Sequence, residues 1–526
     1  MINGYFETNG FIGPHGVNGV FQHLRINKTG AGLVSSSAIF GVLMAYFALG
    51  TGIALLARRR MVGRTMADFF LANRALGGVV AALTYTATTY SAFMLIGLAG
   101  FTYTGGVGAL GFELIYLSGL VLVAFFGPRF WLAGQRYQYV TPSELLGDRY
   151  QSVPLAVVSA LASVIFLIPY SAVQLIGIGK LLEGISGGSI AFSTGVILAT
   201  IFAVTWAYIG GMRSVAWTDS LQAAVMLVVA TVSVFFIVQR GFGGFDGLFS
   251  GLEREYPRWL TVPGPGFFNF QAFLGLSLPW FFFCLSNPQV SQRLFVPRSL
   301  YQMRIMVMGF LIFGFIYTLI SVIWGFSARL LLPGLTHPDL ATPTLLSLDI
   351  VPTFLALLVM LGITAAAIST VNSIVLTLSS MVARDVLKRF RPGATEEWEL
   401  LVGRLFIPVF TACIYLFALR DLDLIAALSV ASSAGLLVMV PALVGAFFWK
   451  AGTAAAALAS IVLGGSAAVF LQFSGMRPLG MWPGVWSGII SCLIFIGVSL
   501  VTAPPKDKAE EFLGYLKEML NSKRII

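Results

Sequence analysis

The sequence predicts an all-α polytopic membrane protein with about thirteen transmembrane helices, on the basis of three observations. Hydrophobic residues make up 57% of the 526 residues and charged residues only 10%, whereas soluble proteins carry roughly a quarter charged residues. The mean hydropathy is +0.88. Apolar runs of about twenty residues, the length that crosses a bilayer as a helix, recur along most of the chain.

Each predicted span is an apolar run bounded by polar residues, glycine or proline. The spans cover residues 34–57, 75–103, 107–128, 153–182, 190–210, 214–239, 267–290, 302–327, 350–384, 400–420, 422–449, 452–474 and 481–503. Basic residues gather in alternate loops, which the positive-inside rule places in the cytoplasm. They include Arg58, Arg149, Arg213, Arg293, Arg384 and Lys506. We therefore expect an extracellular N-terminus and a cytoplasmic C-terminus.

The two ends of the chain are predicted to be an extracellular segment, residues 1–33, and a cytoplasmic tail, residues 504–526. Apolar residues recur at helical spacing among the charges of the tail. They are Phe512, Leu513, Leu516 and Leu520. The tail is therefore either an amphipathic helix on the inner membrane surface or a simple cytoplasmic extension.

Composition and motifs argue against several classes of protein. The net charge of +10 is dispersed among loops, so no nucleic-acid partner is expected. The three cysteines and three histidines do not cluster, which argues against a disulfide framework and a histidine or cysteine metal centre. The sequence contains neither a His-Glu pair typical of a metal-dependent hydrolase nor a serine and histidine placed as in a serine hydrolase, so an enzyme is not expected. Because no GxxxxGK[ST] loop is present to bind a nucleotide, uphill transport would draw on an ion gradient or the membrane potential.

Two predicted spans carry interruptions at matched positions. The span 75–103 has a hydroxyl-rich centre, where polar atoms are costly unless they serve a site. Five spans further on, residues 267–290 contain Gly275, Ser277 and Pro279 and end at Asn287-Pro288. Such a pair predicts an inverted five-plus-five repeat, with ion and solute near the midplane between unwound segments. Kinked but continuous helices packed through small residues are the alternative. The hydroxyl residues at the centre of the first interrupted span, 75–103, are Thr84, Thr86, Thr88, Thr89 and Ser91.

The span 350–384 offers a stripe of small and hydroxyl side chains on one helix face. The stripe consists of Ala366, Ser369, Thr370, Ser373 and Thr377. Two adjacent hydroxyls together with carbonyls from a broken helix suit a dehydrated monovalent cation, whereas a divalent cation would require carboxylates. Hydroxyls that bond back to the preceding helical turn are the structural alternative.

Several motifs together resemble the sodium:solute symporter family, which has the LeuT-type fold. The resemblance covers about residues 66–450 and rests on DFFLANRALGG, TATTYSAFMLIG, TPSELLGDRY, IPYSAVQLIGIG, GGMRSVAWTDSLQ, NPQVSQRLFVPRS and AAAISTVNS followed by ARDV. The chain is most similar to the pantothenate and monocarboxylate permease branch. The resemblance implies a transport core over 66–450, preceded by an extra helix at 34–57 and followed by two helices within 451–503.

The family resemblance implies a sodium site at the first interrupted helix. Its ligands are the backbone carbonyls of Ala87, Tyr90 and Ala366 and the hydroxyls of Ser369 and Thr370. Sodium is then the coupling ion and not a permanently bound cofactor.

The aspartate of the family's WTD motif falls on Asp219, which implies a role in sodium release or coupling. A helix cap after the Gly210-Gly211 turn is the alternative for this residue. Whether a second sodium site involves Ser373 is left open.

Six residues are predicted to contact the solute: Thr88, Thr89, Ser91, Glu113, Trp280 and Phe283. The resemblance implies Thr89, Glu113 and Phe283, whereas Thr88 and Ser91 are hydroxyls of the interrupted helix and Trp280 lies close to Phe283 in the sequence. Amino-acid carriers of the family have an aspartate at the position of Thr89, so a zwitterionic solute is disfavoured. Glu113 aligns with a sugar-binding glutamate, although a protonated glutamate in helix packing is the alternative. Phe283 aligns with the inner aromatic gate, and ordinary aromatic packing is its alternative.

The sequence thus predicts a secondary active transporter in the cell membrane that couples sodium to uptake of a small organic acid by alternating access. A monocarboxylate or a pantothenate-like acid is favoured, although no arginine or lysine is evident deep in either interrupted helix. The alternatives are proton coupling through Glu113 or Asp219, a sugar or amino-acid substrate, and a substrate-sensing transceptor. The expected partners are the solute, sodium and the lipid bilayer, and the oligomeric state is left open.

Overall fold

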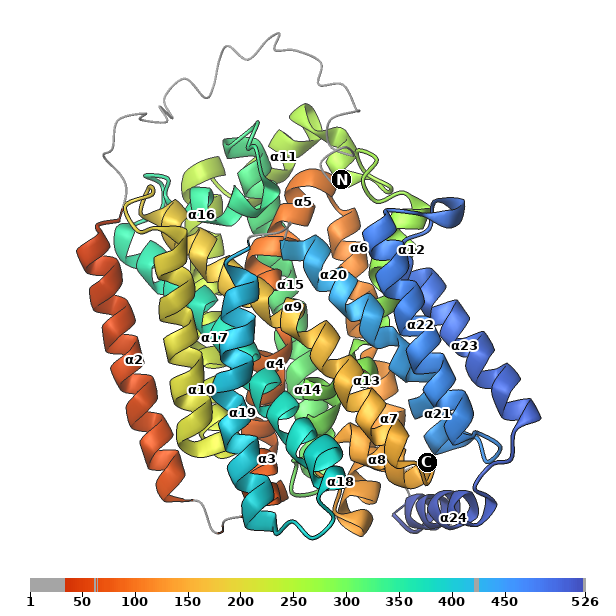
Figure 1. Ribbon diagram of the computed structural model, residues 1–526. Coiled ribbons are helices and arrows are strands. Elements are labelled where there is room, and N and C mark those ends of the chain that lie inside the picture. The colour runs from red at the N-terminus through yellow and green to blue at the C-terminus, as the bar shows by residue number, and fades with distance from the viewer. Residues whose placement is uncertain (1–33, 61–62, 64, 421–424, 524–526) are drawn as a thin grey trace.

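The computed structural model describes residues 34–60, 63, 65–420 and 425–523, and these residues form helices without a strand. An isolated bridge between Leu76 and Pro297 is the one β-type contact among them. The long helices run roughly side by side through the molecule (Figure 1). The predicted extracellular segment 1–33 lies outside the described residues.

Ten helices in the described part of the chain are long and apolar enough to cross a membrane, and a bent helix pair raises the number to 11. The ten are α2 Ser36–Arg59, α6 and α7 Gly108–Tyr137, α9 Val153–Ile185, α10 Phe192–Phe242, α15 Leu300–Leu331, α17 and α18 Thr353–Phe390, α19 Glu396–Ala418, α20 and α21 Leu428–Phe448, α22 Ala454–Ser474 and α23 Pro483–Val501. The number thirteen stays a prediction, because α10 covers two predicted spans and α12, Phe270–Phe281, is shorter than a full span.

The 51-residue α10 is divided by non-helical backbone at Gly210 and Gly211. Gly211 has a φ of 54°, which disfavours any side chain. A Cβ atom there would also lie 2.3 Å from the carbonyl oxygen of Phe69. Glycine is therefore required where the two predicted spans 190–210 and 214–239 meet.

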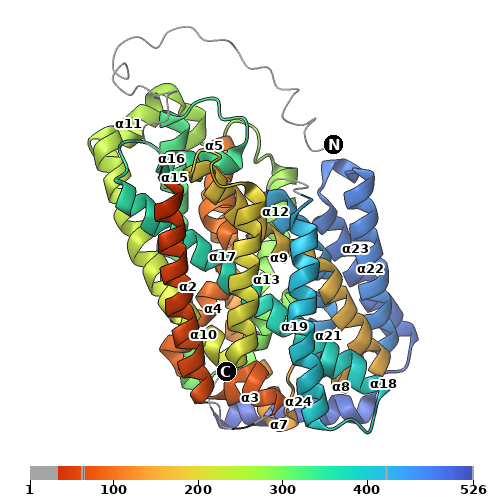
Figure 2. The same cartoon turned by 60° about the vertical axis from the view of Figure 1, so that its left-hand side comes forward.

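Helix α2 packs along α10 through aromatic side chains (Figure 2). The ring of Phe47 stacks on Phe202 at 4.6 Å between centroids, and Tyr46 meets Trp206 edge-on at 5.2 Å. A Cβ atom on Gly50 would lie 2.3 Å from the Trp206 ring, so this glycine permits the close approach.

The first predicted interruption is confirmed. Helix α4, Gly78–Thr89, ends where Tyr90 becomes extended, with φ −87° and ψ 103°. The chain continues as a π-helical segment, η2 Phe93–Leu98, and then as α5 Ala99–Gly105. The two halves are bent by 55°.

The second interruption lies later in the chain than predicted. Gly275, Ser277 and Pro279 all lie within the continuous helix α12. The helical geometry instead breaks at Phe282 and again at Asn287, on either side of the short helix α13, Phe283–Ser286. Asn287 is extended, with φ −93° and ψ 110°, and α14 begins at Pro288 and ends at Ser291.

Tertiary packing explains the role of Gly275. A Cβ atom on this glycine would lie 2.3 Å from the Cβ atom of Trp482, the residue that precedes α23. Glycine therefore permits a close helix contact at this point and does not break the helix.

The C-terminal tail forms the amphipathic helix α24, Lys506–Ser522, which lies across the lower end of the bundle (Figure 1). Its apolar residues Phe512, Leu516 and Leu520 are buried. Phe512 stacks on Tyr137 at 5.5 Å, and the Lys508 ammonium lies 2.9 Å from the Asp148 carboxylate. The apolar face of the tail thus packs on the protein.

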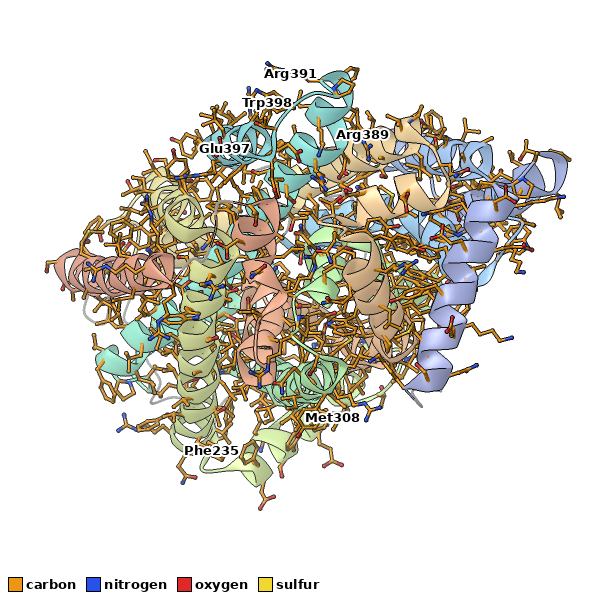
Figure 3. All side chains as sticks on the ribbon, turned by 90° about the horizontal axis from the view of Figure 1, so that it is seen from below. Phe235, Met308, Arg389, Arg391, Glu397 and Trp398 are labelled. Carbon is orange, nitrogen blue, oxygen red and sulfur yellow. The ribbon has the colours of Figure 1, made fainter. Side chains whose placement is uncertain are left out.

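The lower end of the molecule also carries charged and aromatic side chains of α18, Lys388–Phe390, the turn that follows it and α19. Seen from below, Arg389, Arg391, Glu397 and Trp398 lie together at one edge of the bundle (Figure 3). The Arg391 guanidinium lies 5.3 Å from the centre of the Trp398 ring. This end is the one that the positive-inside rule predicts to be cytoplasmic.

Candidate functional site

The broken end of α4 and the hydroxyl stripe of α17, Thr353–Met381, come together in the core. The Ser369 hydroxyl lies 2.7 Å from the Ala87 carbonyl oxygen and 2.9 Å from that of Ala366. The Thr370 hydroxyl lies 3.1 Å from the Ala366 carbonyl oxygen and 3.3 Å from each of those of Ala87 and Thr88. Both side chains are fully buried. The structure therefore brings together four of the five predicted sodium ligands.

This cluster has more oxygen lone pairs than protons. Each hydroxyl supplies one proton, and each carbonyl is an acceptor only. Ser369 and Thr370 therefore cannot satisfy the carbonyls of Ala87, Thr88 and Ala366 at the same time. Since the cluster contains no carboxylate, its chemistry fits a monovalent cation better than calcium or magnesium.

Tyr90, the fifth predicted ligand, is the residue at which the backbone leaves the helix. Its N–H still donates to the Thr86 carbonyl at 2.7 Å. Its ring is fully buried and stacks on Phe310 at 5.2 Å. The position agrees with a carbonyl released from the helix, but the ligand role of Tyr90 stays a prediction.

Asp219 lies in the interior of α10 and is fully buried. Its carboxylate accepts a hydrogen bond from the Thr84 hydroxyl at 2.6 Å and lies 3.5 Å from the Arg293 guanidinium. The alternative that Asp219 caps the helix after Gly211 is therefore wrong. The carboxylate instead joins α4 to the segment that follows α14.

Arg293 was expected in a cytoplasmic loop, and this expectation is wrong. Its side chain is 1% exposed. It donates to the Ser373 hydroxyl at 2.7 Å and to the Gln289 carbonyl at 3.2 Å. The polar run that follows Pro288 reads as a loop, but the short helix α14 and the turn η4, Gln292–Phe295, fold back into the core. No sequence signal separated Arg293 from the loop arginines.

Ser373 lies between this ion pair and the oxygen cluster. Its hydroxyl is 2.9 Å from the Thr88 hydroxyl and donates to the Ser369 carbonyl at 2.8 Å. The carbonyl of Thr88 is itself an acceptor for Thr370. Thr88 therefore connects the predicted sodium site to the Asp219–Arg293 pair.

The hydroxyl groups predicted to contact the solute are engaged within their own segment. Thr88 donates to the Thr84 carbonyl at 2.7 Å, and Thr89 donates to the Tyr85 carbonyl at 2.5 Å. The Ser91 hydroxyl accepts from the Phe93 N–H at 3.2 Å. Thr88 and Thr89 thus bond back to the preceding helical turn. The same back-bonding, which is the alternative given for the hydroxyl stripe of α17, is also found there, from Thr370 to Ala366, from Ser373 to Ser369 and from Thr377 to Ser373.

The other three predicted solute residues lie together in an aromatic environment. The Trp280 ring meets two phenylalanine rings edge-on, each at 5.1 Å between centroids. One is Phe283, and the other is Phe93, which lies just after the first break. Glu113 lies on α6, Gly108–Ser118, directly after Phe112, whose ring stacks on Trp280 at 5.9 Å. The Glu113 carboxylate is fully buried, and the Trp280 side chain is its polar neighbour, although neither carboxylate oxygen makes a hydrogen bond of standard geometry in the described residues.

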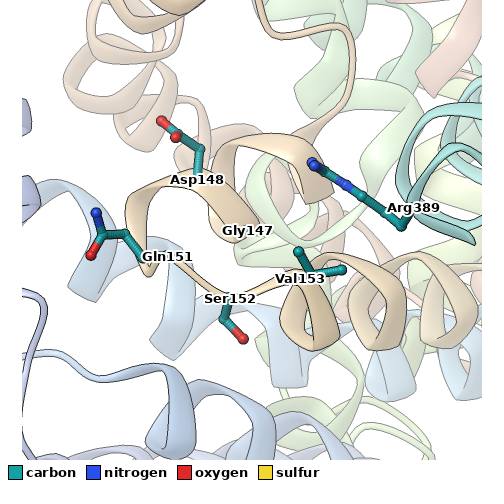
Figure 4. A pocket seen from close by; sticks show the side chains of 6 residues that line it. All are labelled: Gly147, Asp148, Gln151, Ser152, Val153 and Arg389. Atoms are coloured by element: carbon teal, nitrogen blue, oxygen red, sulfur yellow. The ribbon is translucent and has the colours of Figure 1, made fainter. Parts of the chain in front are cut away.

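A surface pocket lies apart from these residues, where α8, Pro142–Arg149, meets the start of α9 (Figure 4). Gly147, Gln151 and Ser152 line one side, and Arg389 projects toward them from α18. None of the predicted site residues lines this pocket.

Comparisons with known proteins agree with this geometry. The sodium:solute symporter family is matched over residues 69–464. The chain is 29% identical to the sodium/pantothenate symporter of Escherichia coli over 469 residues, which cover 86% of this chain and 94% of that protein. It is 24% identical to the sodium/pantothenate symporter of Haemophilus influenzae over 464 residues, with the same two coverages of 86% and 94%.

A solved structure of a sodium-coupled sialic acid symporter, in a substrate-bound outward-open state, has a similar fold. It aligns with a TM-score of 0.76 at 19% identity, covering 89% of this chain and 98% of that one. The predicted LeuT-type fold is therefore confirmed.

Proposed function

The chain belongs to the sodium:solute symporter family, and we propose on that premise that it takes up a small organic acid together with sodium by alternating access. The observation that supports this most directly is the buried cluster of carbonyl and hydroxyl oxygens around Ser369 and Thr370. The two hydroxyls supply two protons to the carbonyls of Ala87, Thr88 and Ala366, so lone pairs remain in the cluster that a cation could bind.

We place one sodium ion between the broken end of α4 and α17. The proposed ligands are the carbonyl oxygens of Ala87, Tyr90 and Ala366 and the hydroxyl oxygens of Ser369 and Thr370. The break at Tyr90 supports this set, because a residue that leaves helical geometry frees the carbonyls of the preceding turn. Asp219 is assigned a coupling role through Arg293 and Thr84 and is not a ligand in this proposal.

We place the solute between the first break and the α12–α13 segment, where Trp280 at the end of α12 and Phe283 at the start of α13 supply aromatic rings. A buried carboxylate without a full set of hydrogen bonds is costly, and Glu113, whose polar neighbour is Trp280, would gain hydrogen bonds from hydroxyl or amide N–H groups of a solute. A pantothenate-like acid has both kinds of donor, whereas acetate has neither. The sodium/pantothenate relatives support the same choice.

The solute's carboxylate is expected to face the bound sodium, away from Glu113. This orientation separates the two negative charges, whose repulsion is strengthened in a site of low dielectric. Thr88, Thr89 and Ser91 lie at the break and are the proposed polar contacts on that side. Their hydroxyls would exchange an internal hydrogen bond for one to the solute.

Proton coupling is the second candidate function, and the fully buried Glu113 carboxylate, which makes no hydrogen bond of standard geometry in the described residues, is the observation that favours it. Ionisable residues inside transmembrane helices are often members of proton pathways. The other proposed proton carrier, Asp219, already has Thr84 and Arg293 as partners. Sodium coupling predicts that uptake requires a sodium gradient, whereas proton coupling predicts equal uptake with sodium and with choline at the same pH.

For the topology, we propose an extracellular N-terminus and a cytoplasmic C-terminus in the cell membrane. The basic residues of α18 and α24 at the lower end of the bundle support this orientation. We further propose a transport core over residues 66–450, with residues 34–57 and two helices within 451–503 added outside it.

Uptake into proteoliposomes tests the function. Purified protein is reconstituted, and uptake of labelled pantothenate, acetate, glucose and proline is measured with inward gradients of sodium or choline at equal pH. We expect uptake of pantothenate to exceed that of the other solutes and to require sodium. Equal uptake in sodium and choline would reject sodium coupling, and preferential uptake of proline or glucose would reject the organic-acid assignment.

A further inference from the structure

The backbone N–H groups after the first helix break avoid the carbonyls that precede it. In a continuous helix, the Ala92 N–H would donate to the Thr88 carbonyl four residues earlier. Instead, it donates to the Gln174 side-chain carbonyl at 3.1 Å. The next two N–H groups, of Phe93 and Met94, turn to the hydroxyl and the carbonyl of Ser91.

Gln174 is held in place to accept this hydrogen bond. It lies on α9 and is fully buried. Its amide nitrogen donates to the Tyr170 carbonyl one turn earlier, at 3.3 Å, and this bond points the amide oxygen toward Ala92. Gly177, three residues further along α9, lets the two backbones approach, since a Cβ atom there would lie 3.0 Å from the Ala92 Cβ.

The Thr88 carbonyl, released from Ala92, is available to the oxygen cluster. It accepts from the Thr370 hydroxyl at 3.3 Å, and the neighbouring Ala87 carbonyl accepts from Ser369 at 2.7 Å. The Gln174 amide oxygen therefore accepts the hydrogen bond from Ala92 that the Thr88 carbonyl would accept in a continuous helix. A side chain without an acceptor at position 174 would leave the Ala92 N–H unpaired in the core, which is costly. The Ala92 N–H would then turn to the Thr88 carbonyl, its ordinary partner in a continuous helix.

We propose that Gln174 is a positioning residue for the sodium site, which keeps the helix break open by binding the Ala92 N–H. This inference rests on the proposed sodium-coupled function. It differs from a purely structural role, in which Gln174 would only satisfy a buried donor and its loss would lower stability without a selective effect on sodium. The essential property is the acceptor oxygen, so a glutamate should replace it and a leucine should not.

The test measures binding of radioactive sodium to purified protein in detergent, together with binding of labelled pantothenate at saturating sodium. Gln174→Leu is expected to raise the dissociation constant for sodium at least fivefold. Gln174→Glu, which keeps the acceptor oxygen, is expected to bind sodium within about twofold of the parent or more tightly. If Gln174→Leu does not give a monodisperse protein, Gln174→Asn takes its place with the same expectation, because its amide is one methylene too short to reach Ala92.

Gln222→Leu is the matched control. Gln222 is also a buried glutamine, 2% exposed, but its amide nitrogen donates to the Tyr46 hydroxyl at the contact with α2, and its amide oxygen has no hydrogen-bond partner in the described part of the chain. We expect this variant to bind sodium like the parent. Equal sodium affinity in the parent and Gln174→Leu, or equal losses in the leucine and glutamate variants, would overturn the positioning role. A parent protein that binds no sodium would instead overturn the proposed function itself.

Discussion

Replacing Asp219 by asparagine removes the negative partner of a fully buried arginine, and the structure sets the size of the effect. The carboxylate and guanidinium are 3.5 Å apart and at most 1% exposed. Two unit charges at that separation attract by about 5 kcal/mol at an effective dielectric constant of about 20. Removing one partner of a buried pair typically costs about 3–5 kcal/mol, because the other charge remains desolvated.

Asp219→Asn should therefore lower the free energy of unfolding by about 3–5 kcal/mol. The asparagine oxygen can still accept from Thr84, so most of this loss belongs to the unpaired Arg293. Arg293→Gln should cost a similar amount. The double variant should cost less than the sum of the single variants by about 2–3 kcal/mol, since it leaves no buried charge.

Unfolding in mixed micelles with increasing SDS fraction, followed by the helical circular dichroism signal, measures all four proteins. Sodium binding provides a second readout. The unpaired arginine donates to Ser373, whose neighbour Thr88 belongs to the oxygen cluster, so Asp219→Asn should also weaken sodium binding and the double variant should recover part of it. An Asp219→Asn midpoint equal to that of the parent, or strictly additive losses in the double variant, would refute this account of the ion pair.

Three further variants test other parts of the structure. Ser369→Ala should raise the sodium concentration for half-maximal pantothenate uptake about 10- to 100-fold, because it removes one of the proposed oxygen ligands of a dehydrated cation, a loss of about 1.5–3 kcal/mol if a ligand contributes as much as a hydrogen bond to a charged group. An unchanged value would remove Ser369 from the site. Thr89→Asp should lower pantothenate affinity at least about tenfold in competition binding, since a negative charge at the break repels an anion in low dielectric; unchanged affinity would place the solute elsewhere. Gly211→Ala should lower the thermal unfolding temperature, because a Cβ atom there would lie 2.3 Å from the Phe69 carbonyl oxygen, and an unaltered temperature would show that the turn can relax.

The sequence was sufficient to predict the fold class and the first helix break, and together with the family resemblance it named four residues that meet in the oxygen cluster, Ala87, Ala366, Ser369 and Thr370. It did not name the Thr88 carbonyl, which also belongs to the cluster. Hydropathy reports burial in lipid directly, and the hydroxyl stripe on α17 follows from helical periodicity alone. The second break could not be located in the same way. Local propensity assigned it to Gly275 and Pro279, but Gly275 serves the contact with Trp482, which is more than 200 residues away in sequence.

Arg293 shows a different limit of sequence interpretation. Its neighbours Asn287 and Pro288 are typical of a loop, and an arginine in a loop is ordinarily solvated. Its burial depends on three elements that meet only in the folded chain: Thr84 on α4, Asp219 on α10 and Ser373 on α17. No local pattern encodes this meeting, and the same holds for the hydrogen bond from Ala92 to Gln174.

Thr88 provides the physical link between the predicted sodium site and the lower half of the core. Its carbonyl accepts from Thr370, while its hydroxyl touches Ser373, which in turn accepts from Arg293. If sodium binds the Thr370 hydroxyl as proposed, it competes for the oxygen that now donates to the Thr88 carbonyl, so the position of Thr88 should respond to the ion. Because the Thr88 hydroxyl meets Ser373 and Ser373 accepts from Arg293, two hydrogen bonds would then connect the proposed sodium site to the Asp219–Arg293 pair.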